Sequence, residues 1–362
     1  MEFKMKKWHI GWGTTSACNM KCEFCYSKES RSTHNDSPLL DNIKFIDRNY
    51  SYIDSINYGT GENTLSLEWI SLLSHVAKSF PEISQALTTN GSLVELAPGK
   101  QDVIFSALAE VDISLDFADE KKQNNFRNNE HAYRWALDCI DMCRSKGMTT
   151  TLTMLGIDQT LTEENLEKIF AIATERGCFV RINIFRPNAG QQTPILSYKA
   201  LKESLKWIIN NHKIVSLADP LISALIGNEE KKDGSGISSL RILPDGSVTP
   251  STYLVSSDWK RGHILDLDLS DQRLSDRLIG HHKLNFEWPH SCDGCRVKHH
   301  CKGGAFDRRI IWHQTTDCRD PYCPLENDDV AADWGDLQLN VHVHGSRPCI
   351  HDGYLPTLIF AP

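Results

Sequence analysis

Short apolar runs alternate with helical stretches along most of this chain, and this alternation constrains its fold more than any other feature. The runs SINYG, ALTTN, VDISL, TTTLTML and FVRINIF are typical of strands. Helical segments lie between them, and in one of these, TEENLEKIFAIATERG, Thr162 is a good N-cap and Gly177 a good C-cap. The alternation predicts βαβ units and a parallel sheet, with functional side chains at the carboxyl ends of the strands.

Length and composition are typical of a globular protein without an export or membrane-spanning segment. The 362 residues are 40% hydrophobic, which is enough for one large α/β domain and a smaller one. Neither a signal-peptide pattern nor an apolar run long enough to span a membrane is present in the sequence. The formal charge of -8 argues against a phosphate-backbone binder. We therefore expect a cytoplasmic protein that binds neither nucleic acid nor membrane.

Twelve cysteines form two clusters and four scattered positions. Because disulfides are rare in the cytosol, the clusters favour metal binding. Among the scattered thiols, Cys139 and Cys143 share a helix face with Trp135, and Cys178 opens a strand-like run. We expect these three cysteines to pack in the core as small hydrophobes. The fourth, Cys349, lies in the C-terminal tail.

The N-terminal cluster places Cys18, Cys22 and Cys25 in a C-x3-C-x2-C pattern. Structural zinc sites take four ligands, commonly in C-x2-C pairs, and a four-iron cluster usually takes four thiolates. Three thiolates would leave one iron with open positions that a substrate or cosubstrate can fill. The spacing therefore predicts a cluster that takes part in chemistry.

With Phe24 before the last cysteine, this segment resembles the signature of the radical S-adenosylmethionine (SAM) superfamily. GTGE at 59–62 resembles the family's GGE segment, and TNG at 89–91 and SLD at 114–116 follow in the expected order. The resemblance implies a partial (β/α)6 TIM-like barrel and a [4Fe-4S] cluster that binds SAM. It assigns cofactor binding to these residues: Phe24, Gly59, Thr60, Gly61, Glu62, Asn90, Ser114, Asp116 and Arg181.

Physical roles follow from that resemblance. Glu62 would accept the SAM ammonium group, and Phe24 would lie near the adenine. Arg181 and Arg186, in the run RINIFRPN, would pair either with the SAM carboxylate or a substrate acid, or form structural salt bridges. The cofactor supplies a 5′-deoxyadenosyl radical after reductive cleavage, and the protein orients it.

The second cysteine cluster follows a charged and Gly-rich junction near residue 230 and a hairpin pattern around Pro244-Asp245-Gly246. It resembles the SPASM or twitch extension of radical SAM enzymes, which implies a small iron–sulfur domain. Thr249-Pro250-Ser251 and Ala305 stand where ligands of a first auxiliary cluster usually fall, so we expect one auxiliary [4Fe-4S] cluster. Its implied ligands are Cys292, Cys295, Cys301 and Cys323.

Two alternatives stay open for this cluster. Cys318 competes with Cys323 for the fourth position, although the DPYCP context favours Cys323. A four-thiolate zinc ribbon fits the same spacing. We expect a radical SAM core barrel over residues 1–232, a SPASM/twitch-like domain over 233–325, and a tail over 326–362.

The tail allows two hypotheses. LQLNVHVHG alternates like a strand, with His342 and His344 on one face. Together with Cys349 and His351 these histidines would form a metal site, but an exposed strand is favoured. Alternatively, the tail closes over the active site, and Cys349 is a catalytic hydrogen-atom donor, as thiols are in radical epimerases.

The substrate is predicted from the class of extension. Enzymes with SPASM or twitch extensions mostly modify ribosomal peptides, mature sulfatases, or act on small natural products. We expect hydrogen abstraction from a precursor peptide (crosslink, epimerisation or backbone excision), and Trp8 and Trp12 are interpreted as its entrance. Many peptide-modifying members of the family carry a peptide-recognition domain before the first strand, whereas the first predicted strand here starts at Trp8. We therefore expect either a small substrate or a separate leader-peptide-binding partner protein, beside an electron donor such as flavodoxin or ferredoxin. The alternatives are a dehydrogenase or epimerase of a small metabolite, and a non-enzymatic iron or zinc binding protein.

Overall fold

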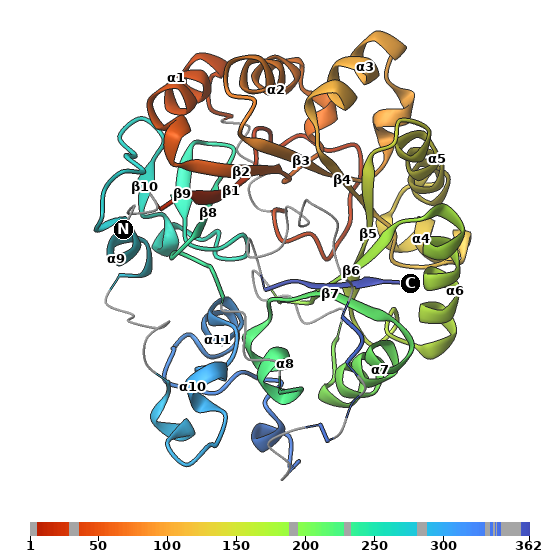
Figure 1. Ribbon diagram of the computed structural model, residues 1–362, viewed down its shortest axis with the longest axis vertical. Coiled ribbons are helices and arrows are strands. Elements are labelled where there is room, and N and C mark those ends of the chain that lie inside the picture. Colours follow the sequence, from red (N-terminus) through yellow and green to blue (C-terminus); the bar gives the residue numbers. More distant parts are fainter. Residues whose placement is uncertain are drawn as a thin grey trace.

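The structure is a computed structural model that describes residues 6–28, 36–187, 195–227, 233–280, 288–329, 334–335, 337, 339–341 and 356–362. Within these residues, eleven strands form one sheet in the order β10-β9-β8-β1-β2-β3-β4-β5-β6-β11-β7. Figure 1 shows this sheet curving around a central space, with helices α1 to α7 on its outside. No described helix has the length and apolarity that crossing a membrane requires.

The first six strands are parallel neighbours in chain order, and helices connect them. The strands are β1 (Trp8–Trp12), β2 (Ile53–Tyr58), β3 (Ser84–Thr89), β4 (Glu110–Ser114), β5 (Thr149–Gly156) and β6 (Phe179–Ile184). The helices are α1 (Leu39–Asn49), α2 (Leu67–Ser79), α3 (Pro98–Ala107), α4 (Glu120–Arg127), α5 (Ala132–Ser145), α6 (Glu163–Arg176) and α7 (Tyr198–Asn211). The predicted α/β class with a partial (β/α)6 barrel is confirmed.

Helix α6 begins and ends where its sequence predicts. The Thr162 side chain accepts a hydrogen bond from the Asn165 backbone N–H, which satisfies one of the donors left at a helix start. Gly177 takes the left-handed conformation at φ +64°, which glycine adopts without a steric penalty. The buried face that packs on the sheet has helical spacing and comprises Leu166, Ile169, Phe170 and Ala173.

The second region extends the barrel sheet beyond β1. The predicted hairpin is confirmed as the antiparallel pair β8 (Ser239–Ile242) and β9 (Ser247–Thr249), and β8 also pairs in parallel with β1. The short strand β10 (Gly262–His263) follows. The remaining helices are α8 (Pro220–Leu225), α9 (Leu274–Ile279), α10 (Lys298–Cys301) and α11 (Phe306–His313). Figure 1 shows α8, α10 and α11 grouped at one side of the barrel, below the central space.

The C-terminal segment returns to the barrel. Strand β11 (Leu358–Ala361) lies between β6 and β7 (Lys213–Leu217) and pairs antiparallel with both. Its first three residues are 0% exposed. Figure 1 shows this dark blue strand beside β6 and β7. In the predicted tail strand, Val341 forms an isolated bridge to Ile214, whereas His342 and His344 lie outside the described residues.

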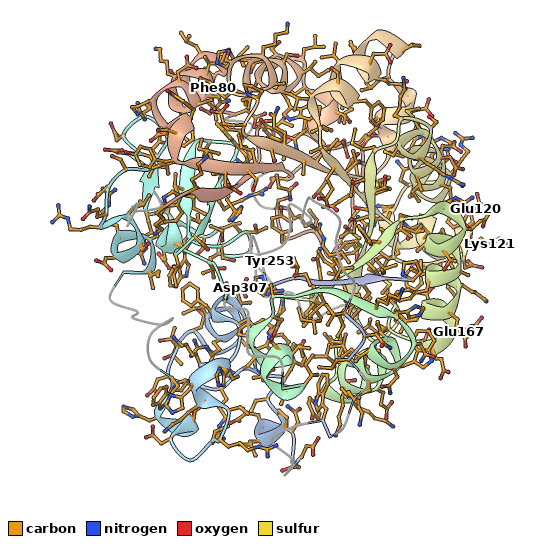
Figure 2. All side chains as sticks on the ribbon, in the orientation of Figure 1. Phe80, Glu120, Lys121, Glu167, Tyr253 and Asp307 are labelled. Carbon is orange, nitrogen blue, oxygen red and sulfur yellow. The ribbon has the colours of Figure 1, made fainter. Side chains whose placement is uncertain are left out.

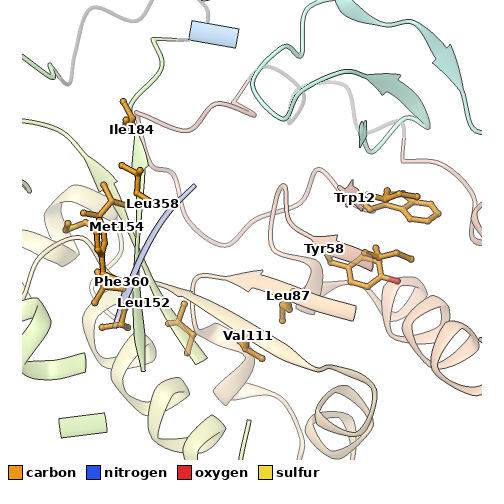
Figure 3. Packing of buried hydrophobic residues seen from close by; sticks show 14 of the residues in the cluster. Trp12, Tyr58, Leu87, Val111, Leu152, Met154, Ile184, Leu358 and Phe360 are labelled. Atoms are coloured by element: carbon orange, nitrogen blue, oxygen red, sulfur yellow. The ribbon is translucent and has the colours of Figure 1, made fainter. Parts of the chain in front are cut away.

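One continuous hydrophobic core joins β1 at one side to β11 at the other (Figure 3). Cys139, Cys143 and Cys178 are buried in it, as predicted. The expectation that Trp8 and Trp12 form an entrance is wrong, because each is 1% exposed. The Trp8 indole N–H donates to the Leu269 carbonyl oxygen at 3.3 Å, and Trp12 packs edge-on against Phe45. Both faces of β1 are covered, so both tryptophans belong to the core.

Candidate active site

A cavity of about 190 Å³ opens where the barrel strands end. The segments that follow β1, β2, β3 and β6 contribute to its wall, as the parallel topology predicts. Segments after β9 contribute as well, so the wall also includes the second region. The cysteines and charged residues that line the cavity are Cys18, Cys22, Cys25, Glu62, Arg127, Arg181, Arg186 and Arg241.

The three N-terminal cysteines lie in one loop after β1 and line the same cavity. Cys22 is 7% exposed, and its thiol donates to the Arg127 carbonyl oxygen at 3.4 Å. The Cys18 sulfur accepts from the Met20 backbone N–H at 3.4 Å. The three thiols form no disulfide within the part of the chain that the structure describes. The loop thus presents three thiol ligands to one space, which fits a cluster with one iron open to a cosubstrate.

The loop after β2 packs directly on the cysteine loop. The Glu62 backbone N–H donates to the Ala17 carbonyl oxygen at 2.7 Å. Gly61 has φ +61°, and a Cβ there would meet the Ala17 carbonyl oxygen at 2.4 Å, so only glycine fits this approach. Thr60 also has a positive φ of +104°. Its hydroxyl contacts the Tyr26 hydroxyl at 3.1 Å and the Arg241 guanidinium.

Glu62 is a buried hydrogen-bond acceptor inside the cavity wall. It is 1% exposed, and its carboxylate accepts hydrogen bonds from the Thr64 hydroxyl (2.7 Å), the Thr89 hydroxyl (2.9 Å) and the Asn90 backbone N–H (2.8 Å). Burial raises the pKa of Glu62 above its ordinary value, although these hydrogen bonds oppose the shift. An ammonium group bound here would offset the unfavourable burial of the negative charge.

The end of β3 and the segment after it hydrogen-bond to Glu62. The Asn90 side-chain amide donates to the Asn19 side-chain oxygen at 2.7 Å, which ties this segment to the cysteine loop. Gly91 has φ +92°, and a Cβ there would meet the Trp135 carbonyl oxygen at 2.6 Å. This glycine allows helix α5 to approach the strand end. Asn90 and Thr89 also line the cavity.

The residues after β4 divide between the cavity and the layer behind it. Ser114 lines the cavity, whereas Asp116 is 0% exposed and is not among the lining residues. The Asp116 carboxylate forms an ion pair with Arg127 (2.6 Å) and accepts from the Leu155 backbone N–H at 2.9 Å. Arg127 in turn lies 5.1 Å from the ring centroid of Phe24. Asp116 is therefore placed to position Arg127, and direct cofactor contact by Asp116 stays a prediction.

Phe24 lines the cavity, as expected for an apolar contact. Its ring stacks on Phe126 with centroids 4.2 Å apart, so its orientation is fixed by α4. Arg181 and Arg186 both line the cavity and both form buried ion pairs, Arg181 with Asp112 and Arg186 with Asp307, each at 2.8 Å. Both arginines therefore form the structural salt bridges of the second alternative, and both still line the cavity.

Sequence reasoning missed several lining residues, among them Tyr26, Arg127, Arg241 and Tyr253. Arg241 lies in β8 and donates to the Gly59 carbonyl oxygen, so the second region reaches the loop after β2. Tyr26 follows Cys25 directly, and this adjacency was the only local signal. Cys349, His342, His344 and His351 lie outside the described residues.

A second, smaller cavity gathers four cysteines of the C-terminal cluster. Cys292, Cys295, Cys301 and Cys323 line it together with apolar residues, and Cys318 is not among its lining residues. Burial raises the pKa of Cys323 to about 11 and raises the pKa of Cys292 and of Cys301. Leu221 and Leu225 of α8 also line it. Among the described residues, no three His, Cys, Asp or Glu side chains are arranged for a single metal ion.

The chain resembles known proteins over most of its length. A family model described as the Radical SAM superfamily matches residues 12–172. The cysteine-type anaerobic sulfatase-maturating enzyme of Clostridium perfringens is 21% identical over 323 residues, covering 80% of this chain and 86% of that protein. The Fe-coproporphyrin III synthase of Methanosarcina barkeri is 26% identical over 178 residues, covering 47% of this chain and 41% of that enzyme.

Solved structures share the fold. Streptococcus suis SuiB bound to S-adenosylmethionine superposes with a TM-score of 0.68 at 14% identity, covering 88% of this chain and 77% of SuiB. The anSMEcpe protein with bound AdoMet gives a TM-score of 0.71 at 19% identity, covering 89% of this chain and 95% of that chain. The three thiols, the buried Glu62 acceptor and the arginine-lined wall fit SAM on a cluster with one open iron. Residues 12–172 are therefore a radical SAM domain, in an enzyme that uses SAM and a [4Fe-4S] cluster, and a cysteine-rich region follows this domain.

Proposed function

We propose that this enzyme abstracts a hydrogen atom from a peptide and thereby matures a ribosomally made precursor by a crosslink, an epimerisation or a backbone excision. The observation that carries the radical step is the convergence of Cys18, Cys22, Cys25 and Glu62 on one cavity at the strand ends. When bound, the cluster and SAM supply a 5′-deoxyadenosyl radical for hydrogen abstraction.

The chain's own residues hold and orient the reactants. The three cysteine thiolates would ligate the cluster, and Glu62 would accept the ammonium group of SAM in its buried position. Phe24, fixed by its stack on Phe126, would present an apolar face to the adenine.

Similar structures favour a peptide substrate. One SuiB structure contains the precursor peptide SuiA and superposes with a TM-score of 0.67 at 13% identity. One anSMEcpe structure contains the Cp18Cys peptide, with a TM-score of 0.66 at 18% identity. The proposal includes a separate leader-peptide-binding partner and an electron donor such as flavodoxin or ferredoxin. Oxidation or epimerisation of a small metabolite is the second candidate, because the Methanosarcina barkeri relative is named as the synthase of a coproporphyrin.

An auxiliary [4Fe-4S] cluster is proposed on Cys292, Cys295, Cys301 and Cys323. Their shared cavity supports this ligand set over one that includes Cys318. Four thiolates leave no open iron, so this cluster would carry electrons or support the fold. Residues 1–232, 233–325 and 326–362 are proposed as core barrel, cluster domain and tail, although β8 and β11 hydrogen-bond to barrel strands.

The test is 5′-deoxyadenosine release by anaerobically reconstituted enzyme with SAM and reductant. A lysate of the source organism is separated into a dialysed high-mass fraction and a low-mass fraction. Stimulation that is confined to the high-mass fraction and lost after protease treatment is expected for a peptide substrate. Stimulation by the low-mass fraction alone would contradict the peptide proposal and favour the metabolite enzyme.

A further inference from the structure

Arg186 occupies an unusual position in the cavity wall. It comes two residues after the end of β6, whereas Arg181 lies within that strand. Arg186 is 3% exposed, yet it lines the cavity. Its Nε donates to Asp307 at 2.8 Å, and its Nη1 donates to the Ile184 carbonyl oxygen at 2.7 Å. Its remaining nitrogen, Nη2, is buried and has no hydrogen-bond partner among the described residues.

The surroundings hold this guanidinium rigidly. The Tyr253 ring centroid lies 4.3 Å from the central guanidinium carbon, so the cation stacks on the ring. Asp307 is fixed in turn by the Ser251 hydroxyl, which donates to its second oxygen at 2.9 Å. Figure 2 shows Tyr253 and Asp307 close together at the edge of the central space, where α11 meets the barrel. The Nη2 atom of Arg186 therefore belongs to a guanidinium group whose other contacts fix its orientation.

A buried charged donor without a partner is unfavourable, and an oxyanion in the cavity would remove that cost. Because guanidinium geometry matches a carboxylate, and because the group is already oriented, binding would lose little conformational entropy. Asp307 partly neutralises Arg186. The neighbouring Asp233 adds less negative charge, because burial and Asp307 raise its pKa and favour its neutral form.

Different elements hold Arg186 and the candidate SAM acceptor Glu62. Glu62 lies at the end of β2 and is tied to the cysteine loop, whereas Arg186 is held by α11 and by Tyr253 of the second region. Tyr253 packs edge-on against Tyr26, with centroids 5.5 Å apart, and Tyr26 follows Cys25. The Arg186 and Tyr253 wall is thus next to the cluster loop but is built from other elements. We propose that Arg186, stacked on Tyr253, is a specificity residue that binds a carboxylate of the substrate.

This inference rests on the proposed function, because it takes the cavity as the substrate site. The carboxylate would come from a peptide or from a small acid. Two probe pairs distinguish these sources: acetyl-Gly-Glu-Gly-amide against acetyl-Gly-Gln-Gly-amide, and glutarate against glutaramide. Each probe is titrated into anaerobically reconstituted enzyme by calorimetry, in the presence of SAM. We expect one acid to bind about 10-fold more tightly than its amide, as one charge-assisted hydrogen bond predicts.

Variants test whether Arg186 causes the preference for the acid over its amide. R186Q alone would leave the buried Asp307 carboxylate without its ion-pair partner, so the double variant R186Q/D307N removes both charges together. The double variant should lose the acid preference, with less than about a 2-fold difference left. The matched control R134Q changes an arginine whose side chain is 58% exposed and should keep the preference.

The outcomes are separable. Equal binding of acid and amide by the wild-type enzyme, or no binding of any probe, would overturn the inference. So would an acid preference that persists in R186Q/D307N. Failure of SAM itself to bind the wild-type enzyme in the same calorimeter would instead contradict the proposed function. A preference shown only by the peptide pair assigns a peptide carboxylate, and one shown only by glutarate assigns a small acid.

Discussion

Replacement of Phe360 by alanine is the sharpest test of the strand insertion at the C-terminus. Phe360 is 0% exposed in β11 and pairs with Val180 of β6 and Ile214 of β7. Phe→Ala at a fully buried site costs about 3–5 kcal/mol, because apolar contacts are lost and a cavity remains. The free energy of unfolding should therefore fall by about 3–5 kcal/mol in a urea titration followed by circular dichroism.

Deletion of residues 356–362 should have a larger effect. It removes three fully buried side chains, Leu358, Ile359 and Phe360, at about 1.5–3 kcal/mol each. The sum, about 5–9 kcal/mol, is comparable to the whole stability of a typical protein. The matched control is V341A in the same tail, which is 66% exposed and should change stability by less than about 0.5 kcal/mol. An F360A protein within about 1 kcal/mol of the wild type would refute the insertion of β11.

Further predictions concern the two cysteine sites. E62Q should weaken SAM binding by at least about 10-fold, since it removes the negative charge that, in our proposal, would face the ammonium group. Because burial raises the pKa of Glu62, its carboxylate takes up a proton at a higher pH than an ordinary glutamate does. The SAM affinity of the wild type should therefore fall as the pH is lowered from 8. The E62Q variant should lack this pH dependence. An unchanged pH profile in E62Q would argue against this role. C323A should lose the iron of one cluster in anaerobic iron analysis, whereas C318A should keep it. The reverse result would identify Cys318 instead of Cys323 as the fourth ligand.

The parts of the site that are contiguous in sequence were predicted well. Cys18, Cys22 and Cys25 lie in one loop, and Glu62 follows a strand end, so local pattern and parallel topology together place them in one cavity. The barrel itself follows from alternating strand and helix patterns with good caps, as in α6. Such segments can be predicted from sequence because their local signals agree with one another.

The parts that depend on tertiary contacts were missed. Arg241 reaches the cavity only because β8 pairs with β1, a pairing between segments that are far apart in the chain. Strand β11 spans only Leu358–Ala361, without alternation, and gains its stability from two neighbours. Trp8 and Trp12 were assigned to an entrance because nothing local indicates that both faces of β1 are covered.

The most direct test of the central claim is SAM cleavage by the anaerobically reconstituted protein. We expect reductant-dependent release of 5′-deoxyadenosine by the wild type, and none by a variant in which Cys18, Cys22 and Cys25 are all alanine. Iron analysis of the same samples should show that this variant keeps only the auxiliary iron. Wild-type protein that holds iron but releases no 5′-deoxyadenosine, or equal release by the triple variant, would contradict the account.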